Sequence, residues 1–177
     1  MIGVAAFSGL SLSEIRGLQW DDYDGEFLHV RRAVWRSAIG EPKTEARRQS
    51  VPVIKPLREM LDGYKAMTPG VGWIFTNAKG RPAWLDNLAL REIRPVIEAA
   101  GIRWHGWHAF RRGLATNLYH MGISEAIVQR ILRHEKGSVV TRKHYIQTDT
   151  PQAVVAMKQF EEQWDAIGRQ LDDKRVN

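Results

Sequence analysis

The segment His108-Ala109-Phe110-Arg111-Arg112 begins a stretch whose apolar spacing predicts a helix over residues 108–121, ended by Gly122. On a helix, residues three positions apart lie about 60° apart around the axis, and residues four apart about 40°. His108 can therefore share a helical face with either Arg111 or Arg112. An imidazole beside a guanidinium can bind the oxygens of an anion. The spacing alone also fits a solvated surface pair.

A second cationic cluster follows on the C-terminal side. A helix predicted over residues 124–132 ends in Leu132-Arg133-His134, and Tyr145 comes eleven positions after the histidine, in the segment Thr141-Arg142-Lys143-His144-Tyr145. A free phenol has a pKa of about 10. Nearby positive charge would stabilise its phenolate and so make it a better nucleophile. The alternative is a packing tyrosine whose hydroxyl faces water.

Upstream, the segment Ser11-Leu12-Ser13-Glu14 fits a capping box, with Ser11 as the N-cap of a short helix and Glu14 as its third residue. Residues 26–54 alternate β-formers with turn residues and predict one small antiparallel sheet of two or three strands. Further helices are predicted over residues 55–67, 86–100 and 151–171. Asp86 is expected to cap the second of these, and Pro95 either to kink it or to mark an early turn of another helix. The fold class expected is α+β, mostly helical with a small antiparallel β-sheet.

The composition narrows the function classes. A length of 177 residues favours one domain, and the hydrophobic (44%) and charged (26%) fractions are those of an ordinary globular protein. The absence of cysteine excludes disulfides, thiolate nucleophiles and cysteine-based zinc sites. The net charge of +6 suggests a polyanionic partner. Many soluble proteins are basic, however, so charge alone does not decide this.

In order along the chain, these segments resemble the tyrosine recombinase (phage integrase) family. The catalytic domain of that family carries an Arg, a Lys, His-x-x-Arg, a His or Trp, and a Tyr. The segment Ser8-Gly9-Leu10-Ser11-Leu12-Ser13-Glu14-Ile15 is similar to the first motif, and Pro42-Lys43-Thr44-Glu45 to the segment with the β-hairpin lysine. His108–Arg111, Leu132–His134 and Tyr145 are similar to the rest. The resemblance covers nearly the whole chain, and the ordered set is more specific than any single motif.

The resemblance implies a role for each of these residues. Tyr145 would attack a DNA phosphodiester and form a 3′-phosphotyrosine intermediate. Lys43 would protonate the departing 5′-oxygen, and Arg111 and His108 would bind the non-bridging oxygens. His134 would donate a further hydrogen bond. Preorganised donors of this kind stabilise the charge that a transition state places on its oxygens. The reaction requires no metal and no other cofactor.

The resemblance also implies double-stranded DNA as a partner. Eight basic residues outside the catalytic set are expected to contact it: Arg31, Arg32, Arg36, Arg47, Arg48, Arg112, Arg142 and Lys143. Residues 1–149 would form the catalytic domain. Residues 150–177 would form a helical tail, which either packs on its own domain or, as we hypothesise, is exchanged between protomers of a tetramer on DNA. No stretch predicts a membrane span. The expected location is the cytoplasm of a bacterium, on the nucleoid, with a prophage or another mobile element as the source.

Two features depart from the family's pattern. Ser11 occupies the position of the first catalytic arginine. Arg16 follows five positions later, about 140° around a helix, so it is not expected to replace that arginine. In addition, the apolar start of the chain predicts that the first helix of the domain is incomplete and that an upstream core-binding domain is absent. A weakened recombinase is therefore expected, and the alternative is a catalytically inactive DNA-binding remnant or regulator of the same family.

A metal site is a third hypothesis, because five of the six histidines cluster: His105, His108, His120, His134 and His144. Their spacing matches no recognised zinc pattern, and no pair of carboxylates accompanies them. No metal site is therefore expected.

Overall fold

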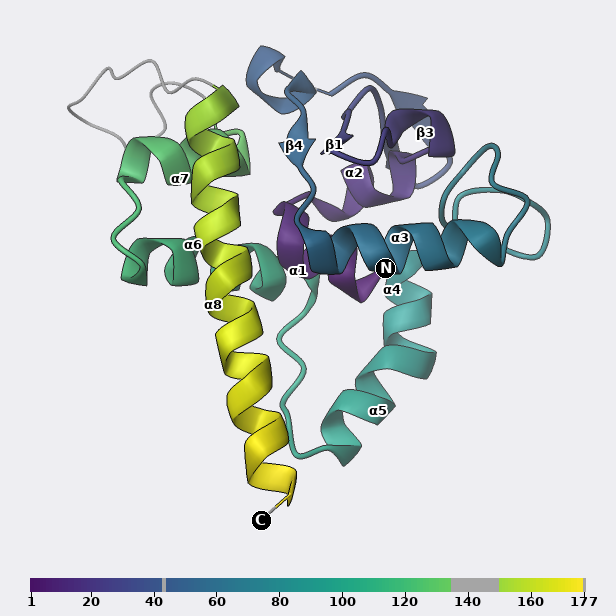
Figure 1. Ribbon diagram of the computed structural model, residues 1–177. Helices are drawn as coiled ribbons and strands as arrows, with labels where there is room; N and C mark the ends of the chain where they lie inside the picture. Colours follow the sequence, from purple (N-terminus) through teal and green to yellow (C-terminus); the bar gives the residue numbers. More distant parts are fainter. Residues whose placement is uncertain (43, 135–149, 177) are drawn as a thin grey trace.

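The computed structural model of the chain describes residues 1–42, 44–134 and 150–176 (Figure 1). Most of this part is helical, and its strands are short and antiparallel, which confirms the expected α+β fold class. The helices are α1 (Ile2–Ser8), α2 (Leu12–Gly17), α3 (Lys55–Ala66), α4 (Leu85–Leu88), α5 (Arg94–Ala99), α6 (Trp107–His120), α7 (Glu125–Leu132) and α8 (Thr150–Val176). The other elements are η1 (Trp20–Asp22), β1 (Phe27–Leu28), β2 (Ala33–Trp35), β3 (Ala38–Gly40), η2 (Glu45–Arg48), β4 (Val51–Pro52) and η3 (Ala89–Ile93).

The strands form two separate two-stranded sheets, so the expectation of a single sheet over residues 26–54 was wrong. β1 pairs with β4, with Leu28 opposite Val51, and β2 pairs with β3, with Val34 opposite Ile39. Leu28 and Val51 are fully buried in the core, whereas every residue of β3 is exposed. The first ladder therefore belongs to the core, and the second is a hairpin that extends from it. The segment between β1 and β2 belongs to neither sheet and connects the two.

The helical stretch of α4, η3 and α5 corresponds to the helix expected over residues 86–100. Its N-cap is Trp84 and not the expected Asp86, which lies inside the first turn. Pro95 has no N–H to donate to the preceding turn. The backbone forms a π-helical turn, η3, and continues as α5, in whose first turn Pro95 lies. Gly101 ends the stretch with φ = 75°, the left-handed conformation expected of a residue after a helix.

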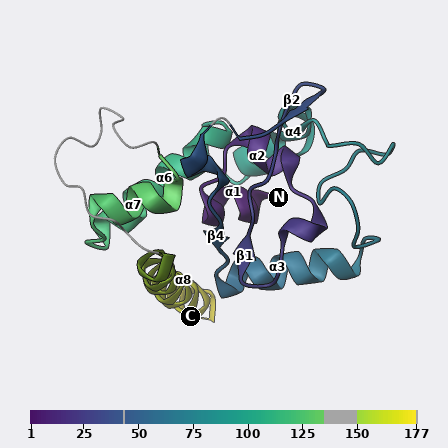
Figure 2. The same cartoon turned by 90° about the horizontal axis from the view of Figure 1, so that it is seen from above.

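One part of the core lies between α1, α6, α7 and α8. Phe7 of α1 is buried, and its ring contacts Phe160 and Trp164 of α8 edge-on, at centroid distances of 6.2 and 5.0 Å. Leu114 and Leu118 of α6 are fully buried in the same cluster. Figures 1 and 2 both show α8 alongside α6 and α7, and Figure 2 views it almost end-on. α8 is thus packed against its own chain.

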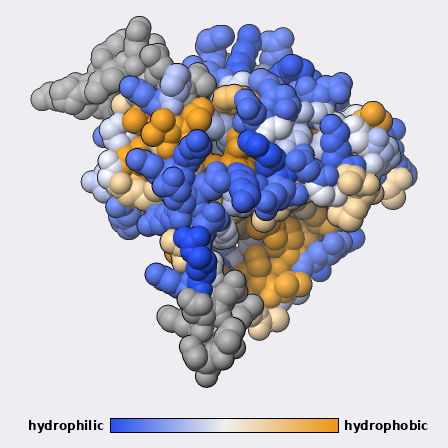
Figure 3. Space-filling model, viewed as in Figure 1, coloured by the Kyte–Doolittle hydropathy of each residue, from blue (hydrophilic) through white to orange (hydrophobic). Residues whose placement is uncertain are grey.

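The surface is hydrophilic around the β strands and more apolar around α4 and α5. Figure 3 shows mostly hydrophilic residues with smaller apolar groups over the upper part of the molecule, and an apolar patch over α4 and α5 at the lower right. Leu90 and Val96 are among the exposed apolar residues of this region, at 61% and 70% exposure. In the described part of the chain, no helix is both long enough and apolar enough to cross a membrane.

Candidate active site

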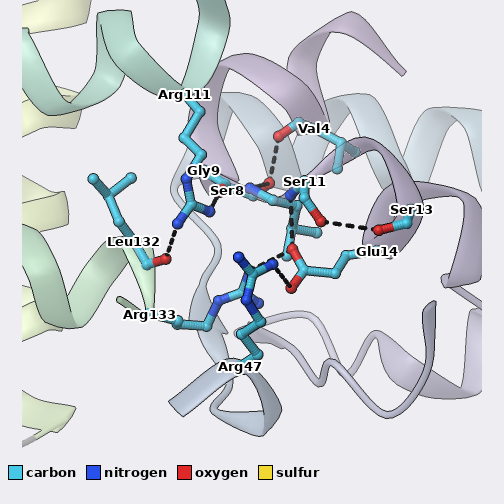
Figure 4. Close-up of polar contacts among 11 residues, drawn as sticks. Val4, Ser8, Gly9, Ser11, Ser13, Glu14, Arg47, Arg111, Leu132 and Arg133 are labelled. Carbon is cyan, nitrogen blue, oxygen red and sulfur yellow. Dashed lines mark hydrogen bonds and ion pairs between the residues drawn. The ribbon is translucent and has the colours of Figure 1, made fainter. Parts of the chain in front are cut away.

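Arg111 lies at the centre of the candidate site. It is the fifth residue of α6, which begins after Gly106, and its side chain is almost completely buried. Its guanidinium donates hydrogen bonds to the carbonyl oxygens of Gly9 and Leu132 (Figure 4). These bonds join the turn between α1 and α2 to the C-terminal end of α7. Burial and the nearby Arg133 lower the pKa of Arg111 to about 10, so it remains a cation at neutral pH.

The first motif forms the turn below Arg111. Ser11 is the N-cap of α2, and Glu14 Oε2 accepts a hydrogen bond of 2.7 Å from the Ser11 backbone N–H, which confirms the expected capping box. The Ser11 hydroxyl lies 3.3 Å from that of Ser13. Glu14 is buried, with 1% of its surface exposed. Ser11 therefore contributes to the structure of this turn and places no positive charge there.

Two further arginines surround the Glu14 carboxylate. Arg133 Nη2 lies 2.8 Å from Oε2, and Arg47 Nη1 lies 3.4 Å from Oε1. Burial by itself would raise the pKa of Glu14, but Arg133, the Ser11 hydrogen bonds and Arg47 outweigh it and lower the pKa. Arg111, Arg133 and Arg47 thus bring three positive charges to a region that contains one carboxylate. Such a region is electrostatically suited to bind an anion.

His134 follows directly after Arg133 and is half-buried. Burial, together with the positive charges of Arg111 and Arg47 and the proximity of His108, lowers its pKa below the usual 6.5. A neutral imidazole is therefore favoured at this position. His108, the second residue of α6, is exposed. The end of α7 thus brings His134 near enough to His108 and Arg111 of α6 for their charges to lower its pKa.

Arg16 does not reach this group, in agreement with the helical spacing. Its guanidinium donates to three backbone carbonyls: Ala83 at 3.0 Å, Val34 at 3.2 Å and Arg36 at 2.8 Å. It also lies 4.7 Å from the ring centroid of Trp84. Arg16 therefore anchors the β2–β3 hairpin and the start of α4.

The residues expected to contact DNA differ in how far they are engaged within the protein. Arg32 is paired with the buried Asp22 at 2.6 Å, and Arg48 with the exposed Glu41 at 2.6 Å. Arg31, Arg36 and Arg112 are exposed on the surface. Lys43, Arg142, Lys143 and Tyr145 lie outside the described residues.

The sequence reasoning missed the contribution of Arg133 and the contact between Arg47 and Glu14. Arg133 occupies a left-handed backbone position (φ = 54°, ψ = 45°) at the end of α7, and this conformation turns its side chain toward α2. A Gly or Asn would have signalled such a conformation, but an arginine does not. Among the described residues, no group of three or more His, Cys, Asp or Glu side chains could hold a metal ion.

Comparison with known proteins identifies similar sequences and folds. The family model described as "Phage integrase family" matches residues 1–151. A curated relative, "Tyrosine recombinase XerC-like" of Caldanaerobacter subterraneus subsp. tengcongensis, is 27% identical over 161 residues, which cover 75% of this chain and 41% of the relative. The chain thus spans less than half the length of that relative.

Solved structures resemble this chain in fold. The Tn1549 transposon integrase, in complex with a circular intermediate DNA, superposes with a TM-score of 0.67 at 19% identity, covering 90% of this chain and 57% of the integrase. XerA recombinase gives a TM-score of 0.62 at 19% identity, covering 92% and 54%. Lambda integrase bound to DNA gives 0.53 at 20% identity, covering 80% and 50%. At these identities, the likeness is one of fold.

Proposed function

Because the chain belongs to the phage integrase family, we propose that it cleaves and rejoins DNA through a 3′-phosphotyrosine intermediate, as the catalytic domain of a site-specific recombinase. The observation that best supports this proposal is the buried guanidinium of Arg111, held by the carbonyl groups of Gly9 and Leu132 and close enough to His134 to lower its pKa. A cation fixed in this way can bind a phosphate without reorganising during the reaction. Residues 1–149 form the proposed catalytic domain.

The proposed reaction is a reversible transfer of a phosphoryl group. The Tyr145 oxygen attacks the phosphorus and loses its proton, a new O–P bond forms, and the bond from phosphorus to the 5′-oxygen breaks. Lys43 donates a proton to that departing oxygen. Arg111, His108 and His134 donate hydrogen bonds to the non-bridging oxygens, where negative charge accumulates. The phosphotyrosine conserves the energy of the broken bond, and attack by a 5′-hydroxyl then restores the DNA strand.

The proposed partner is double-stranded DNA. The net charge of +6 and the exposed Arg31, Arg36 and Arg112 support binding to a phosphate backbone. The integrase relatives in the Tn1549 and lambda structures are themselves bound to DNA. The proposed setting is a bacterial nucleoid, with a mobile element as the source of the protein.

We also propose that residues 150–177 act as an exchangeable tail in a tetramer on DNA. Met157 and Phe160 of α8 are buried against the chain's own core. A neighbouring copy presents the same core surface, so the same contacts can form between protomers. Exchange would couple assembly to the placement of Tyr145, which precedes the tail in the sequence.

Covalent capture tests the proposed reaction. A nicked DNA duplex that carries the attachment site traps the intermediate, because the short 5′-hydroxyl fragment diffuses away after cleavage. The chain is incubated with this duplex at low ionic strength, where phosphate contacts are strongest. We expect a protein band shifted by covalently attached DNA on a denaturing gel, and loss of that band with Tyr145→Phe. A shifted band that persists with Tyr145→Phe would contradict the assignment of the nucleophile.

Ser11 favours a second candidate function, a DNA-binding protein of the same family without catalysis. Removing one oxyanion donor lowers the rate of other enzymes by roughly 10²–10³-fold. If the chain retards DNA on a native gel but forms no adduct, either as found or with Ser11→Arg, this second function is the better one. An adduct in the chain as found would exclude it.

A further inference from the structure

We propose that Arg133 supplies the second guanidinium of the phosphate site, in place of the arginine that the family's pattern has at position 11. This inference rests on the proposed strand-cleavage function and adds a residue to its catalytic set. In it, Arg133 binds a non-bridging oxygen of the scissile phosphate opposite Arg111.

The location of Arg133 is the first support. Its Nη2 and the Ser11 backbone N–H donate to the same oxygen of Glu14, at 2.8 and 2.7 Å. The guanidinium therefore lies beside the backbone of the residue that would otherwise carry the catalytic arginine. Figure 4 shows Arg133 approaching from the end of α7 and Arg111 from α6, with the Ser11 turn facing both.

The hydrogen bonding of Arg133 is incomplete, which is the second support. The side chain is 1% exposed, yet its Nε and Nη1 find no acceptor among the residues that the structure describes. Buried donors are nearly always satisfied in folded proteins, so an exception calls for an explanation. A phosphate oxygen readily accepts a hydrogen bond from a guanidinium N–H, so it could satisfy one of these donors.

The backbone at this position is the third support. Arg133 and Arg36 are the two non-glycine residues with a positive φ in the described part of the chain. A helix commonly ends in this conformation, and glycine is the usual residue there because it has no Cβ. Arg133 is a buried cation at a position where glycine would fit the backbone more easily. This indicates that its side chain is required for function.

The charge balance is the fourth support. Arg133 and Arg47 both lie against the single carboxylate of Glu14, and the positive charge of Arg133 also lowers the pKa of the nearby Arg111. An anion bound between the two arginines would relieve that repulsion. The substrate of the proposed reaction is such an anion.

The competing interpretation is that Arg133 serves only to hold Glu14. The two roles separate when the scissile phosphate is replaced by a methylphosphonate, in which one charged non-bridging oxygen becomes an uncharged methyl group. A guanidinium that stabilises charge on that oxygen becomes dispensable, whereas a residue that only supports the fold is needed equally for both substrates.

The experiment measures adduct formation on nicked duplexes with either group at the cleavage site, for the chain as found, Arg133→Gln and the matched control Arg91→Gln on η3. We expect Arg133→Gln to slow cleavage of the ordinary phosphate by roughly 10²–10³-fold. Its loss on the methylphosphonate should be less than about tenfold, and Arg91→Gln should change neither rate. The ratio of the two rates within one variant does not depend on how much of the protein is folded. Equal losses on both substrates, or no loss on either, would overturn the proposal.

A relocation of the charge gives a second test. Arg133→Gly removes the guanidinium while suiting the backbone, and should slow cleavage of the ordinary phosphate by the same roughly 10²–10³-fold. Adding Ser11→Arg in the same chain should restore it, and a folded double variant without activity would count against the proposal.

If the chain as found forms no adduct but Ser11→Arg alone does, the proposed function stands and the role of Arg133 fails. If no variant forms an adduct, the proposed function itself fails.

Discussion

Glu14 and Arg133 form an ion pair with 2.8 Å between Oε2 and Nη2, and their side chains are only 2% and 1% exposed. The two residues are 119 positions apart in the sequence, so the pair links the first turn of α2 to the end of α7. Arg111 spans the same two segments through the carbonyl groups of Gly9 and Leu132. The candidate phosphate site is therefore also a structural junction.

Replacing Glu14 by Gln should destabilise the protein strongly. The buried Arg133 would lose its counter-charge, and breaking a buried ion pair by removing one partner costs roughly 3–5 kcal/mol. Urea unfolding followed by circular dichroism measures the change. The control is Glu41→Gln, since Glu41 is 77% exposed in its pair with Arg48 and should contribute less than about 1 kcal/mol. Similar losses in the two variants would show that burial does not strengthen the Glu14 pair.

The same pair predicts a dependence of stability on acid. The pKa of Glu14 is lowered from 4.5 in the folded protein, so the carboxylate stabilises the fold at pH values above 4.5. This contribution is lost as the pH falls below 4.5 and through the lowered folded pKa. We expect the unfolding free energy to fall in this acid range, and the fall to be smaller in Glu14→Gln. Parallel pH profiles of the two proteins would refute the assignment.

His134 predicts a second pH dependence, at higher pH. Its folded pKa is below 6.5, so the unfolded chain binds the proton more readily than the folded chain. The neutral imidazole therefore favours folding above 6.5, and stability declines as the pH falls from 6.5 toward the folded pKa. His134→Gln should make the unfolding free energy depend less on pH in this interval. The fall below pH 4.5 that is assigned to Glu14 should remain. Direct titration of the imidazole by NMR provides the check, and a pKa at or above 6.5 would be incompatible with this account.

Gly17 should not tolerate a side chain. A Cβ built at this position would lie 2.5 Å from the carbonyl oxygen of Arg32 and 3.1 Å from the Cα of Ala33, which are backbone atoms of the adjoining segment. Gly17→Ala should therefore lower the melting temperature through overpacking, by the equivalent of about 1–3 kcal/mol. Gly63→Ala in α3 is the matched control, because no atom lies within 4 Å of its Cβ. An alanine there should stabilise the helix by about 0.5–1 kcal/mol, and a loss at Gly63 equal to that at Gly17 would rule out the steric explanation.

Phe160 should dominate the docking of α8. It is 6% exposed and contacts the ring of Phe7, so Phe160→Ala should remove roughly 3–5 kcal/mol of stability. Val155, on the same helix and 58% exposed, serves as the control and should change stability little when replaced by Ala.

Light scattering with DNA present and absent reports whether α8 is exchanged. If the tail is exchanged on DNA, Phe160→Ala should weaken the tetramer, and an unchanged tetramer would exclude α8 as its link.

Several elements of the fold could be predicted from the sequence because local interactions determine them. The capping box of Ser11 and Glu14, the N-cap at Ser124 and the left-handed Gly101 follow from side chains and backbones within a few positions of one another. The division into two sheets was not predictable, because β1 pairs with a strand more than twenty positions away and β2 with its immediate neighbour. The pairing of strands that are distant in sequence depends on which side chains are buried in the core, and this is decided by the tertiary structure.

The sequence by itself determined the family, through the order of its motifs, and it showed that Ser11 departs from the first of them. It also determined that Arg16 could not compensate, since the turn of a helix directs that side chain elsewhere. Only the tertiary structure showed that Arg133 enters the same region from the end of α7. The physical reason is that two features of the tertiary structure place this side chain. The left-handed backbone at the end of α7 sets the direction of the Arg133 side chain, and the packing of the helices brings it to the carboxylate of Glu14.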